Sequence, residues 1–127
     1  MIVQTKSTED YLEAIIILRE TGAATVTGIS RLLEVKKPSV NAAINRLAAR
    51  GLVTHEKYGP IELTEKGDRI ATEVYARHKL LRHFLRDILK VNPETANAEA
   101  CKVEHCISEE SLDKLNSFIR ETQWSRS

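Results

Sequence analysis

Residues 25–51 read T-V-T-G-I-S-R-L-L-E-V-K-K-P-S-V-N-A-A-I-N-R-L-A-A-R-G, and they contain the most informative pattern in the chain. Apolar residues in the first part recur at helical spacing and predict a short helix that starts near Thr27. Pro38 suits a first helical position, and apolar residues follow at i, i+3, i+4 and i+7 from Val40. Gly51 is expected to end this second helix in the left-handed conformation. Two short helices joined by about four residues predict a helix-turn-helix.

A hairpin follows this helix pair. Residues 52–58 and 61–64 have the composition of two short strands, and the Gly-Pro dipeptide between them predicts a turn. Another helix, expected over residues 7–20, precedes the pair. The chain is therefore expected to be mainly α, with an N-terminal winged helix-turn-helix of three helices and a two-stranded hairpin over residues 1–70.

Helices are also predicted for the rest of the chain. A long helix is expected over residues 65–89, and two shorter ones over 94–106 and 109–122. We assign residues 71–127 to a second, helical domain and expect the long linking helix, near 65–90, to be shared by both domains.

The composition is that of a globular protein. Of 127 residues, 42% are apolar and 29% charged, and no apolar stretch is long enough to cross a bilayer. The start of the chain does not resemble a signal peptide. With only two cysteines, Cys101 and Cys106, a disulfide scaffold is not expected. These observations predict a cytoplasmic protein with no membrane partner.

The charge is unevenly distributed along the chain. Residues 31–57 contain six basic and two acidic residues, a net charge of +4, whereas the remainder contains 13 basic and 16 acidic residues, a net charge of −3. A basic island in an acidic chain indicates a polyanion partner. The alternative is chance clustering on a solvated surface.

The second helix of a helix-turn-helix enters the major groove of double-stranded DNA, where its polar side chains meet bases and phosphates. Three-helix units with a hairpin also mediate protein contacts, which is the alternative here. The residues predicted to contact DNA are Lys36, Lys37, Pro38, Ser39, Asn41, Asn45, Arg46, Arg50, Lys57 and Tyr58.

Potential metal ligands recur at helical spacing outside this DNA-reading segment. Taken singly, each has an ordinary explanation, because helical carboxylates are usually solvated and a single cysteine often fills a small apolar space. Together their thiolate, imidazole and carboxylate groups suit Fe²⁺, Mn²⁺, Co²⁺, Ni²⁺ or Zn²⁺. The candidate ligands are Asp10, Glu13, His78, Cys101, Glu104 and His105.

Five motifs lie in order along nearly the whole chain: S-T-E-D-Y-L-E-A-I, K-P-S-V-N-A-A-I-N-R-L-A-A-R-G-L-V, Y-G-P-I-E-L-T-E-K-G, Y-A-R-H-K-L-L-R-H-F-L and E-A-C-K-V-E-H-C-I-S. With these motifs the chain resembles the diphtheria toxin repressor and manganese transport regulator family of metal-dependent repressors. The resemblance implies a winged helix, a long linking helix and a helical dimerisation domain. It also implies that divalent metal drives a homodimer onto palindromic operators upstream of metal-uptake genes.

The resemblance assigns ligands by position. Five of the six candidates match ligands of the manganese branch, whereas Cys101 stands where that branch has glutamate and the iron branch has cysteine. Asp10 stands where the iron branch commonly has methionine. Arg82 and Asn97 occupy positions that carry a glutamate and a histidine of the iron branch's second metal site, so that site is poorly supported here.

The single sulfur ligand decides the expected effector. Because sulfur favours Fe²⁺ over Mn²⁺, we expect Fe²⁺ first and Mn²⁺ second as co-repressor, with Zn²⁺, Co²⁺ or Ni²⁺ able to bind in vitro. The sequence ends before the SH3-like third domain of many iron-branch members, so no such domain is expected. The resemblance also suggests a dimer interface, which we assign to Leu80, Phe84, Val103, Ile107, Leu112, Leu115, Phe118 and Ile119.

Three other functions compete with a metal-dependent repressor. A winged-helix regulator without a metal effector is of the same class. A metallohydrolase would need an open coordination position in a substrate-sized pocket, which nothing in the sequence indicates; no enzyme activity and no small-molecule substrate are therefore expected. A redox sensor would use Cys101 and Cys106, but at i and i+5 the two thiols point to different sides of a helix.

Overall fold

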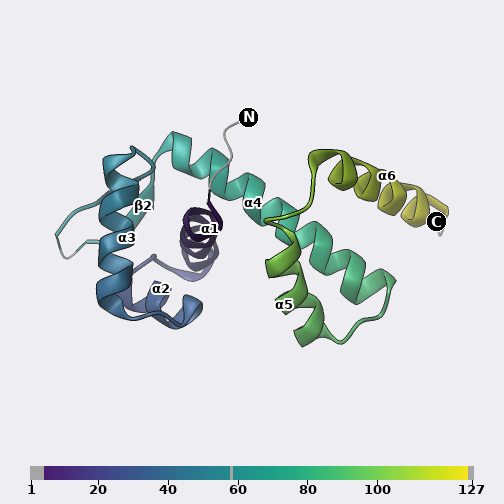
Figure 1. Cartoon of the computed structure of the whole chain (residues 1–127), viewed down its shortest axis with the longest axis horizontal. Helices are drawn as coiled ribbons and strands as arrows, with labels where there is room; N and C mark the ends of the chain where they lie inside the picture. The colour runs from purple at the N-terminus through teal and green to yellow at the C-terminus, as the bar shows by residue number, and fades with distance from the viewer. Residues whose placement is uncertain (1–4, 58, 126–127) are drawn as a thin grey trace. The chain divides into compact units, whose positions relative to one another are not determined.

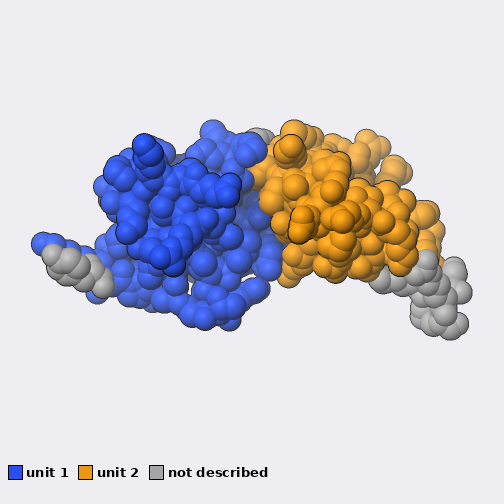
Figure 2. All heavy atoms as spheres, turned by 90° about the horizontal axis from the view of Figure 1, so that it is seen from below, with its two compact units in different colours: residues 1–75 blue, residues 76–127 orange. Residues whose placement is uncertain are grey.

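The computed structural model of the protein describes residues 5–57 and 59–125, with side chains as far as Thr122 (Figure 1). The chain forms two compact units, residues 1–75 and 76–127, which Figure 2 colours separately. The division falls inside helix α4 (Glu65–His83). Among the described residues, no helix has the length and hydropathy needed to span a bilayer.

The N-terminal unit is a three-helix bundle with a hairpin. Its helices pack against one another, and the hairpin strands pair in antiparallel fashion with Val53 opposite Leu63. Ile61 N–H also donates to the Ala24 carbonyl at 2.9 Å, which joins the chain before the helix pair to the wing. The elements before α4 are α1 (Lys6–Thr21), α2 (Val26–Leu33), α3 (Lys37–Ala49), β1 (Val53–His55) and β2 (Ile61–Leu63).

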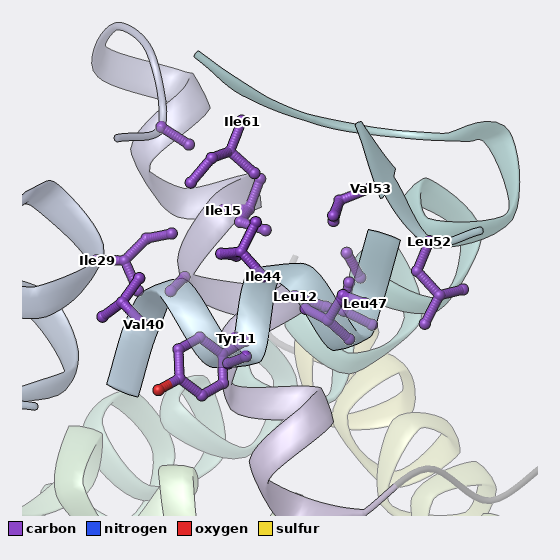
Figure 3. Packing of buried hydrophobic residues seen from close by; sticks show 14 of the residues in the cluster. Tyr11, Leu12, Ile15, Ile29, Val40, Ile44, Leu47, Leu52, Val53 and Ile61 are labelled. Atoms are coloured by element: carbon purple, nitrogen blue, oxygen red, sulfur yellow. The ribbon is translucent and has the colours of Figure 1, made fainter. Parts of the chain in front are cut away.

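One apolar core holds this unit together (Figure 3). Leu12 of α1, Ile29 of α2 and Val40 of α3 are all fully buried. Truncating such side chains to alanine typically costs about 2–5 kcal/mol of stability. The outward face of α3 is thereby left free to carry polar residues.

The turn between α2 and α3 is stabilised by local hydrogen bonds. Glu34 adopts the left-handed conformation, with φ of 56°, and ends α2. Ser30 Oγ donates to the Val35 carbonyl at 2.5 Å, and Val35 N–H donates to the Ser30 carbonyl at 3.1 Å. These bonds satisfy backbone groups that the end of α2 leaves open, and they set the direction in which α3 starts.

Helix α4 starts against the segment that precedes β1. Thr64 caps it by accepting a hydrogen bond from Gly67 N–H at 3.1 Å. A Cβ atom on Gly67 would lie 1.9 Å from the Leu52 carbonyl oxygen, so only glycine allows this approach. Helix and hairpin are therefore in direct backbone contact.

The C-terminal unit contains the rest of α4, the π-helical turn η1 (Phe84–Ile88), α5 (Pro93–Val103) and α6 (Glu109–Ser125). Asn92 caps α5 by accepting from Glu94 N–H, and α5 packs on η1. Ala96 and Ala100 are fully buried, and their small side chains allow close packing of α5.

The structure confirms the predicted fold class: mainly α, with three helices and a two-stranded hairpin followed by a helical region. The helix predicted over residues 65–89 is helical as far as Ile88, as α4 followed directly by η1; at Phe84 the backbone hydrogen bonding changes to the π type, and Leu89 N–H reaches the Phe84 carbonyl. One predicted helix end was wrong. The helix predicted to reach residue 106 ends at Val103, because Cys106 N–H bonds the Val103 carbonyl and tightens the last turn. The domain ranges 1–70 and 71–127 stay a prediction.

Candidate metal centre

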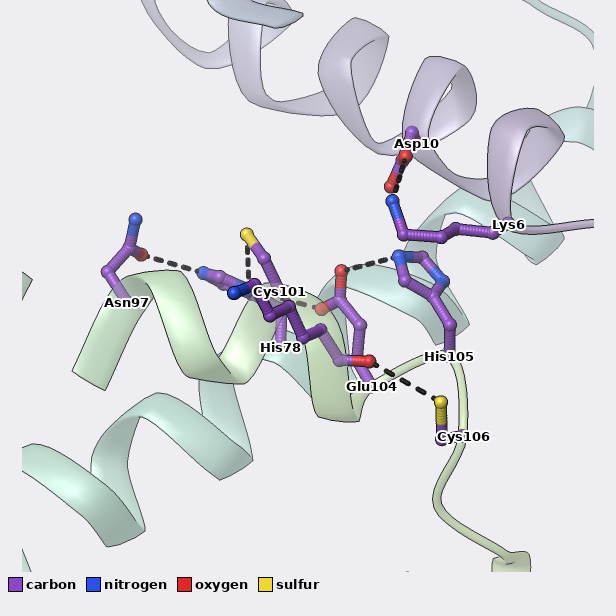
Figure 4. A network of polar contacts seen from close by, with 9 residues as sticks. Lys6, Asp10, His78, Asn97, Cys101, Glu104, His105 and Cys106 are labelled. Atoms are coloured by element: carbon purple, nitrogen blue, oxygen red, sulfur yellow. Dashed lines mark hydrogen bonds and ion pairs between the residues drawn. The ribbon is translucent and has the colours of Figure 1, made fainter. Parts of the chain in front are cut away.

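Three potential ligand atoms converge within the C-terminal unit (Figure 4). His78 comes from α4, Cys101 from α5, and Glu104 from the turn that follows α5. Cys101 Sγ lies 3.7 Å from His78 Nδ1, and Glu104 Oε2 lies 3.1 Å from the same nitrogen. One ligand atom from each of the three lies within 4.8 Å of the others, which is close enough for a single ion to contact all of them.

Glu104 lies between two imidazoles. Its Oε2 faces His78, and its Oε1 lies 3.3 Å from His105 Nε2. The Glu104 side chain is 1% exposed, and the His78 and His105 side chains are each 4% exposed. A buried carboxylate is costly unless positive charge compensates it. The site therefore requires cationic partners, which are either protonated imidazoles or a metal ion.

The pKa of His78 reflects the negative charge around its ring. Burial alone lowers the pKa of His78, but the contacts with Cys101 and Glu104 outweigh burial and raise the pKa to about 10. Without metal, the His78 ring therefore carries the positive charge that balances its acidic neighbours at neutral pH.

The donor chemistry fits a divalent transition metal. A thiol, an imidazole and a buried carboxylate combine soft and hard ligand atoms, as borderline ions such as Fe²⁺, Co²⁺ and Zn²⁺ prefer. Both Glu104 oxygens are buried; Oε2 lies 3.1 Å from His78 Nδ1, and Oε1 lies 3.3 Å from His105 Nε2. A divalent ion bound here would compensate the carboxylate charge in place of the imidazoles.

Asn97 also belongs to this cluster, although the sequence indicated it only as a departure from an iron-branch ligand. Its Oδ1 lies 2.9 Å from His78 Nε2. Asn97 precedes Cys101 by four residues on α5, so both lie on one helix face. This i, i+4 spacing was the available indication that Asn97 would reach the same histidine.

Helix α5 ends before two of the three candidate ligands that the sequence placed on it. The sequence places Cys101, Glu104 and His105 on one helix face, whereas only Cys101 is inside α5. Glu104 keeps helical backbone angles as the C-cap, with its N–H bonded to the Ala100 carbonyl at 3.0 Å. It therefore stays on the face of Cys101, and His105 follows in the turn.

Asp10 and Glu13 belong to the N-terminal unit. They share one face of α1, where Lys6 Nζ pairs with Asp10 Oδ2 at 3.0 Å, and Glu13 is 7% exposed. Their role as metal ligands stays a prediction.

Most of the residues predicted to contact DNA lie in α3 or at its two ends, and Lys57 lies in the hairpin between β1 and β2. All of the described ones are exposed, and Arg50 donates to Thr8 Oγ1 at 3.4 Å. Pro38 lies in the first turn of α3, with Lys36 as its N-cap. Tyr58 lies outside the described residues. The contacts with DNA stay predictions.

The residues predicted for the dimer interface differ in exposure. Phe118 of α6 is 51% exposed, and its ring meets Phe84 edge-on with centroids 6.3 Å apart. Val103 is 38% exposed. Ile119, in contrast, is only 4% exposed within a single chain, so little of its surface is left for a partner. The interface as a whole stays a prediction.

Comparisons with known protein families agree with this arrangement. A model of the iron-dependent repressor N-terminal DNA-binding domain matches residues 4–61. A model of the iron-dependent repressor metal-binding and dimerisation domain matches residues 64–123. The two matches meet next to the start of α4 and together cover most of the chain.

Individual relatives are similar over most of their length. An uncharacterised HTH-type transcriptional regulator of Methanocaldococcus jannaschii is 36% identical over 117 residues, which are 91% of this chain and 94% of that protein. The HTH-type transcriptional regulator MntR of Bacillus subtilis is 34% identical over 117 residues, 91% of this chain and 82% of that protein.

Solved structures share the fold. IdeR of T. acidophilum superposes with a TM-score of 0.78 at 30% identity, over 94% of this chain. The manganese regulator SloR gives a TM-score of 0.78 at 29% identity, over 92% of this chain. The chain spans 55% of each of these two solved chains. From the two family matches, the relatives and the shared fold, we conclude that the chain belongs to the diphtheria toxin repressor and manganese transport regulator family of metal-dependent transcriptional repressors.

Proposed function

We propose that this repressor responds to Fe²⁺ first and Mn²⁺ second, and that the loaded homodimer binds palindromic operators of metal-homeostasis genes. The observation that supports the choice of metal most strongly is Cys101, whose Sγ lies 3.7 Å from His78 Nδ1 beside a buried carboxylate. A thiolate binds Fe²⁺ more strongly than Mn²⁺, because the softer ligand prefers the softer ion.

Each residue of the cluster has a distinct part in holding the ion. Cys101 supplies sulfur, His78 supplies Nδ1, and Glu104 supplies a buried carboxylate oxygen. His105 faces the second Glu104 oxygen and can bind the ion or hold the carboxylate in place. A bound divalent ion would supply the positive charge that His78 carries in its absence.

Asp10 and Glu13 complete the proposal for regulation. The resemblance makes them ligands, and they belong to α1 of the DNA-binding unit. If both units hold one ion, the ion favours the arrangement in which the α3 helices of a dimer match successive half-sites. The metal then shifts the conformational equilibrium of the protein towards the DNA-competent state. The size of this shift is set by how much more tightly the metal binds that state than the other.

The proposal is tested by selecting duplexes from a random-sequence DNA pool with purified full-length protein and Fe²⁺, without oxygen. We expect the selected duplexes to share a palindromic consensus. A chelator should abolish binding of the protein to this consensus, and Fe²⁺ should restore the binding at a lower concentration than Mn²⁺.

Glu104→Gln is the informative variant, because it removes the charge and keeps the shape of the side chain. Glu99→Gln, on the exposed side of α5, is the matched control. Chelator-resistant binding by the wild type, or metal-dependent binding by Glu104→Gln that equals that of the control, would contradict the proposed site.

A further inference from the structure

Asn97 contacts the edge of His78 that faces away from the other ligands. Its Oδ1 lies 2.9 Å from Nε2, while Nδ1 of the same ring faces Glu104 Oε2 at 3.1 Å and Cys101 Sγ at 3.7 Å. A carboxamide oxygen only accepts hydrogen bonds, so Nε2 is the nitrogen that carries a proton in this contact.

These contacts together determine how the ring is turned. Rotating the imidazole by half a turn about its Cβ–Cγ bond would replace both nitrogens by carbons, and would remove the contacts with Asn97 and Glu104 together. Since the His78 side chain is 4% exposed, water has little access to compensate for such a change. The ring therefore has one orientation in which both nitrogens are satisfied.

We propose that Asn97 is a positioning residue for the metal centre: it accepts the Nε2–H of His78, and so makes Nδ1 the ligating nitrogen and fixes the plane of the ring. This inference rests on the proposed metal site. Histidines that bind metals generally donate their other N–H to a protein acceptor, and removing that acceptor typically weakens metal affinity about 10- to 100-fold.

The fold explains why this acceptor comes from α5. Asn97 and Cys101 are one turn apart on the same helix, and Ala96 and Ala100 beside them are fully buried. The helix that presents the thiol to Nδ1 therefore also presents the carboxamide to Nε2. Asn97 itself is exposed, so substituting it leaves the packing of α5 intact.

The test compares metal affinity in four full-length proteins: the wild type, Asn97→Ala, Asn97→Asp and the control Thr95→Ala, an exposed residue of the same helix. Each is titrated with Co²⁺ or Zn²⁺ under anaerobic conditions. We expect Asn97→Ala to lose about tenfold in affinity. We expect Asn97→Asp to stay within about threefold of the wild type, because a carboxylate oxygen also accepts from Nε2–H.

A spectroscopic measurement separates positioning from a general effect on the fold. In the Zn²⁺-loaded wild type, nitrogen-15 spectra of the histidine rings should show His78 with a proton on Nε2 and none on Nδ1. In Asn97→Ala, the Nε2 proton should exchange faster with water, whereas Thr95→Ala should match the wild type.

The outcomes distinguish this inference from the proposed function. If the wild type binds neither ion, both fail. If the wild type binds metal but Asn97→Ala binds equally well, or Asn97→Asp is as weak as Asn97→Ala, only the role of Asn97 is overturned. A Zn²⁺ ion bound through Nε2 of His78 would overturn it as well.

Discussion

At the scale of single residues, Cys101 distinguishes this chain from the manganese branch that it otherwise resembles. Its sulfur lies 3.7 Å from His78 Nδ1, next to a carboxylate that is buried between two imidazoles. Every other candidate ligand is an imidazole or a carboxylate, so this one atom sets the softness of the site.

Replacing Cys101 by glutamate should therefore change metal preference. We expect Cys101→Glu to lower Zn²⁺ affinity by at least about tenfold relative to Mn²⁺ affinity, because an oxygen ligand suits the harder ion better. Competition titrations with both ions measure the ratio, and Cys106→Ser, at an exposed cysteine, is the control. An unchanged ratio would mean that Cys101 does not bind the metal.

The charge of His78 predicts a pH dependence of metal binding. The contacts with Cys101 and Glu104 raise the pKa of His78 to about 10, so the metal-free ring holds a proton at neutral pH. A metal ion must displace that proton, so affinity should rise as the pH rises from about 6.5 to 8, by up to about tenfold per unit from this group. Zn²⁺ titrations in two buffers of different ionisation enthalpy count the released protons. Binding without proton release would contradict the protonated ring.

At the scale of the elements, helix starts were easier to predict than helix ends. The helices predicted to start at residues 65 and 109 do start there, because Thr64 and Ser108 accept hydrogen bonds from N–H groups of the first turn. The π-turn at Phe84 and the end of α5 at Val103 depend instead on small changes in backbone hydrogen bonding that no residue type marks. Residue type, helical spacing and the family resemblance together selected His78, Cys101 and Glu104, and the structure brings these three side chains together; their role as metal ligands stays a prediction. The i, i+4 spacing places Asn97 on the helix face of Cys101, but which nitrogen of His78 it contacts depends on how α5 packs.

The contact between α4 and the segment before β1 gives a prediction about stability. In Gly67→Ala the new Cβ would lie 1.9 Å from the Leu52 carbonyl oxygen, and a backbone atom cannot move aside cheaply. We expect the free energy of unfolding to fall by about 3 kcal/mol. Gly28→Ala is the control, since its closest neighbours are side-chain atoms at 3.2 Å, and it should change stability by less than about 1 kcal/mol. Equal denaturation midpoints for the two variants would contradict the close approach.

At the scale of the whole molecule, we propose that metal binding and DNA binding are coupled. The predicted DNA-reading residues belong to the N-terminal unit, whereas the thiol–imidazole–carboxylate cluster belongs to the C-terminal unit. Coupling between two sites is reciprocal: if metal strengthens DNA binding by some factor, DNA strengthens metal binding by the same factor. Helix α4 belongs to both units, and the sequence predicted it as their shared element.

The most direct test is the Fe²⁺ affinity of the full-length protein, measured without oxygen in the presence and absence of the selected operator duplex. We predict that the duplex lowers the Kd for Fe²⁺ by about 5- to 150-fold, the usual range for coupled sites, and that Glu104→Gln removes the effect. An Fe²⁺ affinity that is the same with and without the duplex would contradict metal-dependent DNA binding by this protein.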